Sequence, residues 1–169
     1  DIFEKYFNEN HLIGLGITSR KNLDDNYNYY NSFSVFDNKL NLIDNYNKIK
    51  LVPFGEFVPI EKILNKFGLK TITNNIGSFE KGVNRKIIKI QDDLKQINFL
   101  PLICYEIIYS GNLTKDFDFD FILNISEDGW FGKSIGPKQH FIHSKFRAIE
   151  NGKYVIRSSN NGMAAIINP

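Results

Sequence analysis

A short apolar run that ends at the only cysteine is the feature that most restricts the fold of this chain. Residues Phe99 to Cys104 are nearly all apolar, which predicts a buried strand. Tyr105 and Glu106 follow at once, so the thiol lies where the strand ends and polar residues begin. That position suits a nucleophile, but cysteine is also among the most buried residue types and often packs as a small hydrophobe. The run alone leaves catalysis and core packing both open.

Composition limits the class of protein. The chain has 169 residues, 42% of them hydrophobic and 14% aromatic, which suits one domain, or a large piece of one, with a substantial core. Its 21 basic and 19 acidic residues are spread along the chain, and no basic stripe predicts a nucleic-acid partner. A single cysteine excludes an internal disulfide. No apolar run approaches the ~18 to 20 residues of a membrane span, and no signal peptide opens the chain.

Hydrophobic periodicity predicts a layered α/β architecture. The chain starts inside a helical pattern without a methionine and stops just after a strand, so we expect an excerpt of a longer protein. A helix follows Pro137, with Ile142, Phe146 and Ile149 on one face and Gly152 as its cap. Residues 160–162, Asn-Asn-Gly, are typical of a hairpin turn. Strands are predicted at 11–18 (short, buried and closely packed at its glycines), 31–37, 40–46, 86–90, 96–104, 116–125, 153–159 and 163–168, with a loop at 19–30, a short helix from 61 to 68 and a mobile arm at 57–84.

A cysteine nucleophile needs a cation or base close by, and Lys48 is the first candidate. Any single lysine is usually a solvated surface residue. Here, however, it precedes the apolar run Leu51-Val-Pro-Phe-Gly-Glu-Phe-Val-Pro59, which contains one carboxylate. Burying that carboxylate, Glu56, is costly unless a positive or hydrogen-bonding group meets it. We therefore expect Glu56 to be paired, with Lys48 as the natural partner and Lys50 as the alternative.

Two further polar clusters follow predicted strands. Glu106 lies just after the cysteine, where it is either a site residue or a helix-start residue favoured by the helix dipole. The loop 126–137 holds three glycines around the only tryptophan, Trp130. Tight loops at strand ends carry substrate contacts more often than core packing does. The sequence therefore places a second set of candidate contacts in this loop.

Metal and serine-triad chemistry have little support in the sequence. His140 and His143 are three residues apart on one predicted helix and could face the same way. A metal site would need a third ligand at recognisable spacing, and His11 offers no such motif. No Gly-x-Ser-x-Gly run occurs either, so a Ser-His-Asp triad is not indicated.

These runs together resemble the carbon–nitrogen hydrolase (nitrilase) superfamily, and within it the apolipoprotein N-acyltransferases. Each run alone is weak, but several in the right order are specific, since general nitrilases share only the lysine and cysteine contexts. The likeness extends from about Leu12 to Pro169. The matching runs are 46–48 (Tyr-Asn-Lys), 51–59, 103–107 (Ile-Cys-Tyr-Glu-Ile), 130–137 (Trp-Phe-Gly-Lys-Ser-Ile-Gly-Pro), 139–140, 147–150 (Arg-Ala-Ile-Glu) and 157–162 (Arg-Ser-Ser-Asn-Asn-Gly).

The resemblance implies a four-layer αββα sandwich of the nitrilase type that lacks its first strand and its C-terminal part. Residues 1–169 would form a partial carbon–nitrogen hydrolase domain, with the arm at 57–84 within it. By position, Cys104 would be the nucleophile, Lys48 the triad lysine, and Glu56 a second essential glutamate that supports the lysine. Tyr105 and Glu106 match residues that flank the nucleophile, and Trp130 lies in a family loop near the site.

The implied activity is acyl transfer through a cysteine thioester. The donor would be a phospholipid, and the acceptor the N-terminal amine of diacylglyceryl-cysteine on an apolipoprotein, with no cofactor and no metal. The place would be the periplasmic face of a bacterial inner membrane, reached through membrane segments absent from this chain. Four apolar residues would line a lipid-facing arm or else form ordinary core: Phe54, Phe57, Phe67 and Leu69.

Two departures from the family pattern bear on activity. The family's triad glutamate, in a Trp-Pro-Glu run upstream of the first strand, has no counterpart, and Glu4 and Glu9 should not take its role. Residues 127–129 are Glu-Asp-Gly where the family usually has Asn-Asp-Ala, a conservative difference. We therefore expect the isolated chain to be inactive. Two other interpretations stay open, a nitrilase-like amidase acting on a small amide or nitrile with the same residues, and an incomplete lipid-binding scaffold.

Overall fold

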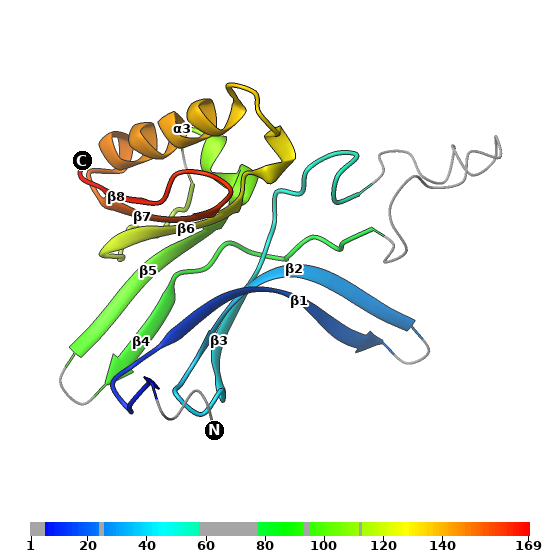
Figure 1. The fold of residues 1–169 in the computed structure, drawn as a ribbon. Helices are drawn as coiled ribbons and strands as arrows, with labels where there is room; N and C mark the ends of the chain where they lie inside the picture. Colours follow the sequence, from blue (N-terminus) through cyan, green and yellow to red (C-terminus); the bar gives the residue numbers. More distant parts are fainter. Residues whose placement is uncertain (1–5, 24–25, 58–77, 93–94, 112) are drawn as a thin grey trace.

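Two β-sheets and one long helix make up the computed structural model (Figure 1), which describes residues 6–23, 26–57, 78–92, 95–111 and 113–169. The first sheet is antiparallel and has the order β1 (Ile13–Leu23), β2 (Asn26–Phe36), β3 (Leu42–Asn47). The second is mixed and has the order β4 (Ile88–Asp92), β5 (Lys95–Ile103), β6 (Phe121–Glu127), β7 (Tyr154–Asn160), β8 (Ala165–Ile167). The helices are η1 (Cys104–Ile108), η2 (Gly129–Phe131) and α3 (Gly136–Asn151).

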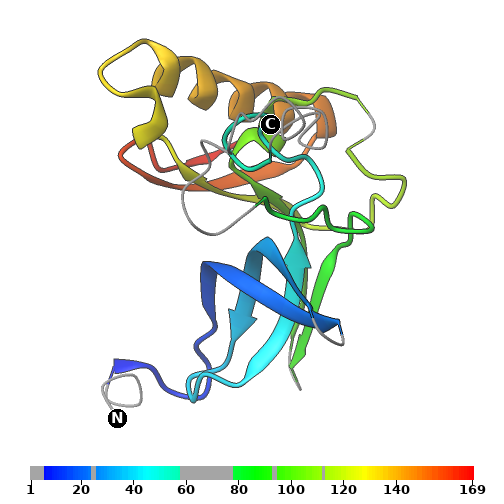
Figure 2. The same cartoon turned by 90° about the vertical axis from the view of Figure 1, so that its right-hand side faces the viewer.

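Strand β5 lies between two cores because its side chains alternate between its two faces. Leu100 and Leu102 belong to the cluster under α3, which also contains Ala148 of that helix. Phe99 and Ile103 belong to the cluster that the two sheets share. The result is a stack of helix, five-stranded sheet and three-stranded sheet, which Figure 2 shows from the side.

This stack is the α/β architecture expected from the sequence, with two sheets and a helix layer on one outer face. A second helix layer, which a complete αββα sandwich requires, is not among the residues that the structure describes. The predicted helix from 61 to 68 and most of the arm at 57–84 lie outside the described residues, as does most of the helical pattern near the start of the chain. Within the described ranges, no helix combines the length and hydrophobicity needed to cross a membrane.

The hairpin of β1 and β2 is longer than the sequence predicted. Its strands pair over eleven residues each, so the loop predicted at 19–30 is wrong. Polar cross-strand pairs stabilise this part of the ribbon. The hydroxyl oxygens of Ser19 and Ser32 are 2.6 Å apart, and the guanidinium of Arg20 lies 4.9 Å from the ring centroid of Tyr27. The polar composition that suggested a loop is therefore the composition of a solvated ribbon.

Strand β1 lies at the edge of its sheet, and the prediction that residues 11–18 are buried is wrong, since Leu15 is 41% exposed. The predicted close packing of its glycines is confirmed. A β-carbon on Gly14 would lie 2.8 Å from the ring of Phe33, and one on Gly16 would lie 2.9 Å from a methyl group of Ile125. The glycines thus let a β6 side chain reach β1 across the two sheets.

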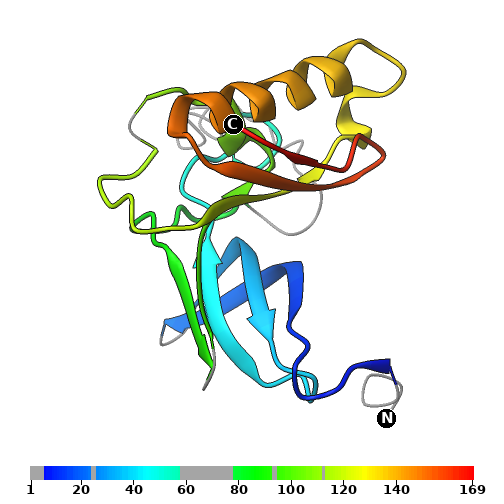
Figure 3. The same ribbon diagram turned by 90° about the vertical axis from the view of Figure 1, so that its left-hand side faces the viewer.

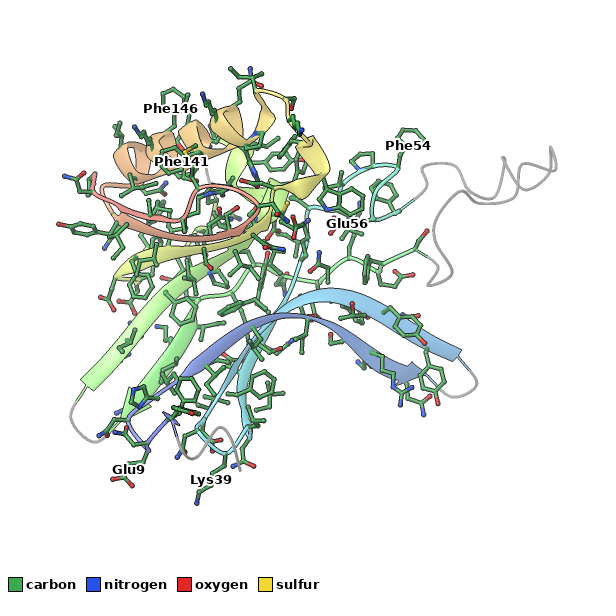
Figure 4. All side chains as sticks on the ribbon, viewed as in Figure 1. Glu9, Lys39, Phe54, Glu56, Phe141 and Phe146 are labelled. Atoms are coloured by element: carbon green, nitrogen blue, oxygen red, sulfur yellow. The ribbon has the colours of Figure 1, made fainter. Side chains whose placement is uncertain are left out.

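Helix α3 begins and ends where its sequence signals lie. Pro137 is in the first turn, and Gly152 caps the helix in the left-handed conformation at φ +59°. Its buried residues are mostly polar, and its apolar stripe faces outward, with Phe146 projecting from the outer side in Figure 4. The buried set is His140, Ser144, Arg147 and Ala148, and the exposed set is Ile142, Phe146 and Ile149.

Strands β5, β6 and β7 are parallel, so their carboxyl ends meet at one edge of the sheet. Ligands of open α/β sheets bind at this edge. Cys104 follows β5, the tryptophan loop follows β6, and the Asn-Asn-Gly turn follows β7. Figure 3 shows the loop after β6 (yellow) beside the turn after β7 (red) at one end of the sheet. The topology thus places the sequence-predicted site residues of the second sheet beside one another.

Candidate active site

Cys104 occupies a strained position at the carboxyl end of β5. It is the first residue of η1, it is partly exposed, and its φ is +50°. A non-glycine residue in this left-handed conformation destabilises the folded state by about 1 to 3 kcal/mol, and such residues cluster at functional sites. A sharp strand-to-helix turn is also the device that presents a nucleophile at the edge of a sheet. The backbone therefore favours the catalytic interpretation of the thiol over simple core packing.

The predicted pairing of Lys48 with Glu56 is confirmed. The Lys48 Nζ lies 2.9 Å from Glu56 Oε1 and 2.8 Å from Oε2, and the exposed fractions of the two side chains are 1% and 13%. Two more donors hold the carboxylate, since Asn31 Nδ2 donates to Oε1 at 2.5 Å and the Val52 amide donates to Oε2 at 2.7 Å. Lys50 is exposed instead, with its ammonium 5.3 Å from the ring centroid of Tyr109.

A tight turn brings Glu56 back to Lys48. The amides of Gly55 and Glu56 both donate to the Val52 carbonyl, and the Phe54 amide donates to the Phe57 carbonyl. Phe54 has φ +61° and is exposed, so it projects from the loop while Glu56 stays inside (Figure 4). In the described residues 51–57, Pro53, Gly55 and Glu56 thus lie in a loop whose only charged side chain faces the lysine.

Glu106 connects the segment that carries the lysine to the segment that carries the cysteine. It is fully buried, and its Oε1 accepts from the amides of Ile49 at 3.0 Å and Lys50 at 3.1 Å. Its Oε2 accepts from the amide of Ile103 at 2.9 Å. Because Ile49 directly follows Lys48 and Ile103 directly precedes Cys104, one carboxylate fixes the spacing of the two segments. Glu106 is therefore a central part of the site rather than only a helix-start residue.

Two more side chains complete the surroundings of Glu106. The Tyr46 hydroxyl donates to Oε1 at 2.8 Å, and Arg85 donates to that hydroxyl at 3.0 Å while its other terminal nitrogen lies 3.4 Å from Oε1. Burial and the negative charge of Glu106 raise the pKa of Tyr46 far above its ordinary value, so the hydroxyl keeps its proton and remains a donor. Sequence reasoning missed Arg85, which stands in a polar stretch without any motif.

A buried polar network lies beneath the cysteine. His140 Nδ1 is 2.8 Å from Asp128 Oδ1, and its Nε2 is 3.2 Å from the carbonyl oxygen of Cys104. Arg157 forms an ion pair with Asp128, with Nη2 2.8 Å from Oδ2. The sequence singled out His140 only as a weak metal candidate and did not single out Asp128 or Arg157. The one available signal was that His140 and Arg157 fall within runs that resemble a known family, and that Asp128 keeps the family's aspartate within a triplet that otherwise departs from it.

The charges of this network are set by burial and by hydrogen bonds. Burial lowers the pKa of His140, the bond to Asp128 opposes this, and the positive charge of Arg157 adds to the lowering. Burial alone would raise the pKa of Asp128, but hydrogen bonds from Ser126 and His140 and the charge of Arg157 outweigh it and hold that pKa below its usual range. The ring of His140 thus lies beside a closed ion pair of Asp128 and Arg157.

The tryptophan loop is held by its acidic residues. The Glu127 carboxylate accepts from the amide of Gly129 at 2.7 Å and from the side chains of Asn160 and Asn161. These bonds lower the pKa of Glu127, chiefly the one from Asn161. Trp130 itself is 78% exposed. The structure thus places Trp130 at the surface of the edge that carries Cys104, on a loop that β7 anchors.

The arrangement joins the segment that carries the thiol to the segment that carries the ammonium group, and acyl transfer requires both groups. Both carboxylates of the site are fully engaged, Glu56 by Lys48, Asn31 and the Val52 amide, and Glu106 by its five donors. Neither is free to take the thiol proton. In the described part of the chain, no three His, Cys, Asp or Glu side chains gather as a metal site.

Comparisons with known proteins agree with this geometry. The carbon-nitrogen hydrolase family model matches residues 8–169. An apolipoprotein N-acyltransferase of Rhizobium leguminosarum bv. trifolii is 43% identical over 141 residues, which is 83% of this chain and 26% of that protein. The chain thus spans about a quarter of the length of the curated relatives that it matches.

Solved structures show the same fold at low sequence identity. The glutamine-dependent NAD+ synthetase from Acinetobacter baumannii superposes with a TM-score of 0.59 at 18% identity, over 92% of this chain and 27% of that one. A carbon-nitrogen hydrolase from Helicobacter pylori G27 superposes with a TM-score of 0.56 at 15% identity, over 88% of this chain and 45% of that one.

Proposed function

Because the chain belongs to the carbon–nitrogen hydrolase family, we propose that it is the central part of the catalytic domain of an apolipoprotein N-acyltransferase. In this proposal an acyl chain passes from a phospholipid to Cys104, and from there to the N-terminal amine of a lipoprotein's diacylglyceryl-cysteine. The observation that carries the proposal is the link through Glu106, whose carboxylate binds the amide of the residue after Lys48 and the amide of the residue before Cys104. Its 43% identity to a curated N-acyltransferase supports the choice of substrates.

The first half-reaction forms a thioester. The Cys104 thiol gives up its proton to a base, and Sγ attacks the ester carbonyl carbon of the phospholipid. The C–S bond forms and the ester C–O bond breaks, and the lysophospholipid leaves as an alcohol with the proton. Lys48 and a backbone amide beside Cys104 stabilise the oxyanion. In this proposal the base is the family's triad glutamate, because Glu56 and Glu106 are both engaged by other donors.

The second half-reaction forms an amide. The neutral amine of diacylglyceryl-cysteine attacks the thioester carbonyl, the C–N bond forms, the C–S bond breaks, and the amine proton returns to the sulfur through the same base. Water would hydrolyse the thioester, so the site has to exclude it. Phe54 and Phe57 would line the lipid-facing side, together with Phe67 and Leu69, which lie outside the described residues. No cofactor takes part.

The other site residues act by support. Glu56 holds the Lys48 ammonium in place, because a charge at 1% exposure is costly to bury without a partner. Glu106 holds the lysine and cysteine segments together, and Tyr105 and Trp130 contact the substrate from η1 and from the tryptophan loop. The protein would act on the periplasmic face of the bacterial inner membrane, through membrane segments of the full-length protein.

The test uses the full-length protein in phospholipid vesicles with a labelled acyl chain and a synthetic diacylglyceryl-cysteine peptide. Wild type is expected to transfer the label to the peptide amine and to carry a hydroxylamine-labile acyl group on the peptide that contains Cys104. Cys104→Ala should lower the rate at least about a thousandfold and remove the adduct.

Normal transfer by the Cys104→Ala variant would refute the thioester mechanism. If the wild-type protein releases only free fatty acid, or if it hydrolyses a small amide and transfers nothing, the protein is instead a hydrolase with the same residues. If the wild-type protein shows neither the Cys104 adduct nor any turnover, the result would favour a protein that binds lipid without catalysis.

A further inference from the structure

The backbone of Cys104 needs an outside contact to keep its conformation. With φ at +50°, the residue holds a left-handed shape that persists only when the surroundings fix it. Its carbonyl oxygen accepts a hydrogen bond from His140 Nε2 at 3.2 Å, and this histidine comes from α3, thirty-six residues further along the chain. The buried side chain of His140, from a distant part of the sequence, thus binds the peptide unit of Cys104.

We propose that His140, backed by Asp128 and Arg157, is a positioning residue that holds the Cys104 backbone in this conformation and so aims the sulfur at the acyl carbonyl. This inference rests on the proposed role of Cys104 as the nucleophile. His140 does not touch the reacting atoms in this scheme, and its effect reaches them through the peptide unit of Cys104.

The histidine ring is itself fixed on every side. It is 3% exposed, and its Nδ1 is bound to Asp128 Oδ1. The ring of Phe131 packs against it edge-on, with centroids 5.5 Å apart. Asp128 in turn accepts from the Ser126 hydroxyl at 2.7 Å and from Arg157. Because these contacts keep the ring from rotating, its bond to the Cys104 carbonyl fixes that carbonyl relative to α3.

The network also returns to the strand that carries the cysteine. Arg157 donates to the side-chain oxygen of Asn124, and the Asn124 amide donates to the Leu102 carbonyl at 2.9 Å. The chain of bonds therefore begins at Leu102 and ends at Cys104, two residues later, after passing through β6, β7 and α3. Asn124, Asp128 and Arg157 are all buried, and the two charges cancel. Such closed, fully bonded networks specify one geometry.

The Asn-Asn-Gly turn after β7 closes over this network. A β-carbon on Gly162 would lie 2.2 Å from Asp128 Oδ2, so only glycine lets the turn approach the ion pair. The Arg157 Nε donates to the Met163 carbonyl just beyond the turn at 3.2 Å. The turn, the guanidinium and the carboxylate thus form one packed unit behind His140.

The experiment measures acylation of Cys104 in the full-length protein with p-nitrophenyl butyrate, an ester that needs no lipid site. The burst rate reports how well the nucleophile is aimed, and the burst amplitude reports how many molecules are folded and competent. His140→Gln keeps a donor near the Nε2 position, whereas His140→Asn keeps one only near Nδ1. His143→Asn, on the same helix, is the matched control.

His140→Asn is expected to slow the burst at least about tenfold with a near-stoichiometric amplitude, since small displacements of a nucleophile cost this much or more. His140→Gln should recover to within about threefold of wild type, and His143→Asn should match wild type. An unchanged rate in His140→Asn, a loss confined to amplitude, or a Gln variant as slow as Asn would each overturn the proposal.

Ser126→Ala covers the case in which His140→Asn does not fold. It removes one donor to Asp128 and leaves the ring in place, so a slowing of about two- to fivefold at full amplitude is expected, and an unchanged rate refutes the proposal. Wild-type protein without any burst would overturn the nucleophile and this inference together. A wild-type burst without phospholipid-to-peptide transfer would refute the proposed function only, and the His140 comparison would still decide the positioning role.

Discussion

At the scale of single residues, Glu106 shows how a buried carboxylate can organise a site without reacting in it. A buried negative charge is tolerated only when donors replace its water. Here the amides of Ile49, Lys50 and Ile103 do so from two different segments, with Tyr46 and Arg85 as further partners. The charge therefore selects one relative placement of those segments.

Removing a single donor tests this role. Tyr46→Phe deletes the hydroxyl that donates to Glu106 Oε1 at 2.8 Å and leaves three amides in place. We expect a loss of about 1 to 2 kcal/mol, which is a fall of roughly 2 to 6 °C in the midpoint of thermal unfolding of the full-length protein. Tyr154→Phe, on a half-exposed tyrosine, is the control. Equal midpoints for the two variants would contradict the argument.

The pair of Lys48 and Glu56 gives a second prediction. Glu56→Gln removes the negative charge beside an ammonium group that is 1% exposed, and breaking a buried pair typically costs several kcal/mol. We expect about 2 kcal/mol of destabilisation and at least about a hundredfold slower acyl transfer, measured by thermal unfolding and by the vesicle assay. Glu80→Gln, on an exposed carboxylate, should leave both unchanged. Wild-type transfer by Glu56→Gln would exclude the supporting role of this glutamate.

At the scale of elements, the backbone of residues 78–85 packs against the segment that carries Lys48. The Gly82 amide donates to the Lys48 carbonyl at 2.8 Å, and the Glu80 amide donates to the Tyr29 carbonyl. A β-carbon on Gly82 would lie 2.1 Å from the Asn47 carbonyl oxygen, so the backbones meet too closely for any side chain.

Gly82→Ala should therefore push this segment away from Lys48. We expect the unfolding midpoint to fall by roughly 4 °C or more, about 2 kcal/mol, and acyl transfer to slow with it. Gly55→Ala is the matched control, because its β-carbon would meet nothing closer than 3.4 Å. If the two variants have equal unfolding midpoints, the close approach of the backbones at Gly82 does not contribute to the stability of the fold.

Sequence patterns predicted the elements whose chemistry is local. The apolar run that ends at Cys104 forms β5. Pro137 and Gly152 mark the start and the end of α3. Residues 160–162 connect β7 to β8. The pairing of Lys48 with Glu56 was also predictable, because a lone carboxylate in an apolar run must find a partner.

The elements that the sequence did not predict depend on contacts between distant residues. Residues 19–23 and 26–30 belong to strands, where Ser19 pairs with Ser32 and Arg20 with Tyr27 across the ribbon, which polarity alone does not reveal. The inward face of α3 is polar because its His140 binds Asp128 and the Cys104 carbonyl, so the apolar stripe faces out. Arg85 belongs to no recognised run, and Arg157 belongs to one that does not name its partner. Only the fold shows which carboxylates these two residues meet.

At the scale of the whole molecule, the network behind the cysteine links β5, β6, β7 and α3, and its titration should appear in global stability. The pKa of His140 is lowered from 6.5 in the fold, so the unfolded chain binds more protons below that pH and stability is lost as the pH falls from about 6.5. The pKa of Asp128 is lowered from 3.8, so its contribution is present above that pH and is lost as the pH falls below it.

We therefore expect the unfolding midpoint of the full-length protein to fall in two steps as it is acidified, the first beginning near pH 6.5. His140→Gln should flatten the first step, whereas His143→Gln should not. The measurement is thermal unfolding by intrinsic fluorescence from pH 8 down to about pH 2, so that it covers both steps. A first step that persists unchanged in His140→Gln would assign it to another group.

The bonds of Glu106 also join parts of the chain that are made at different times. Residue 106 is synthesised after residues 49 and 50, whose amides its side chain binds, so these bonds cannot form until residue 106 has been made. The same carboxylate binds the amide of Ile103, so the segments beside Lys48 and Cys104 are joined only after that point in synthesis.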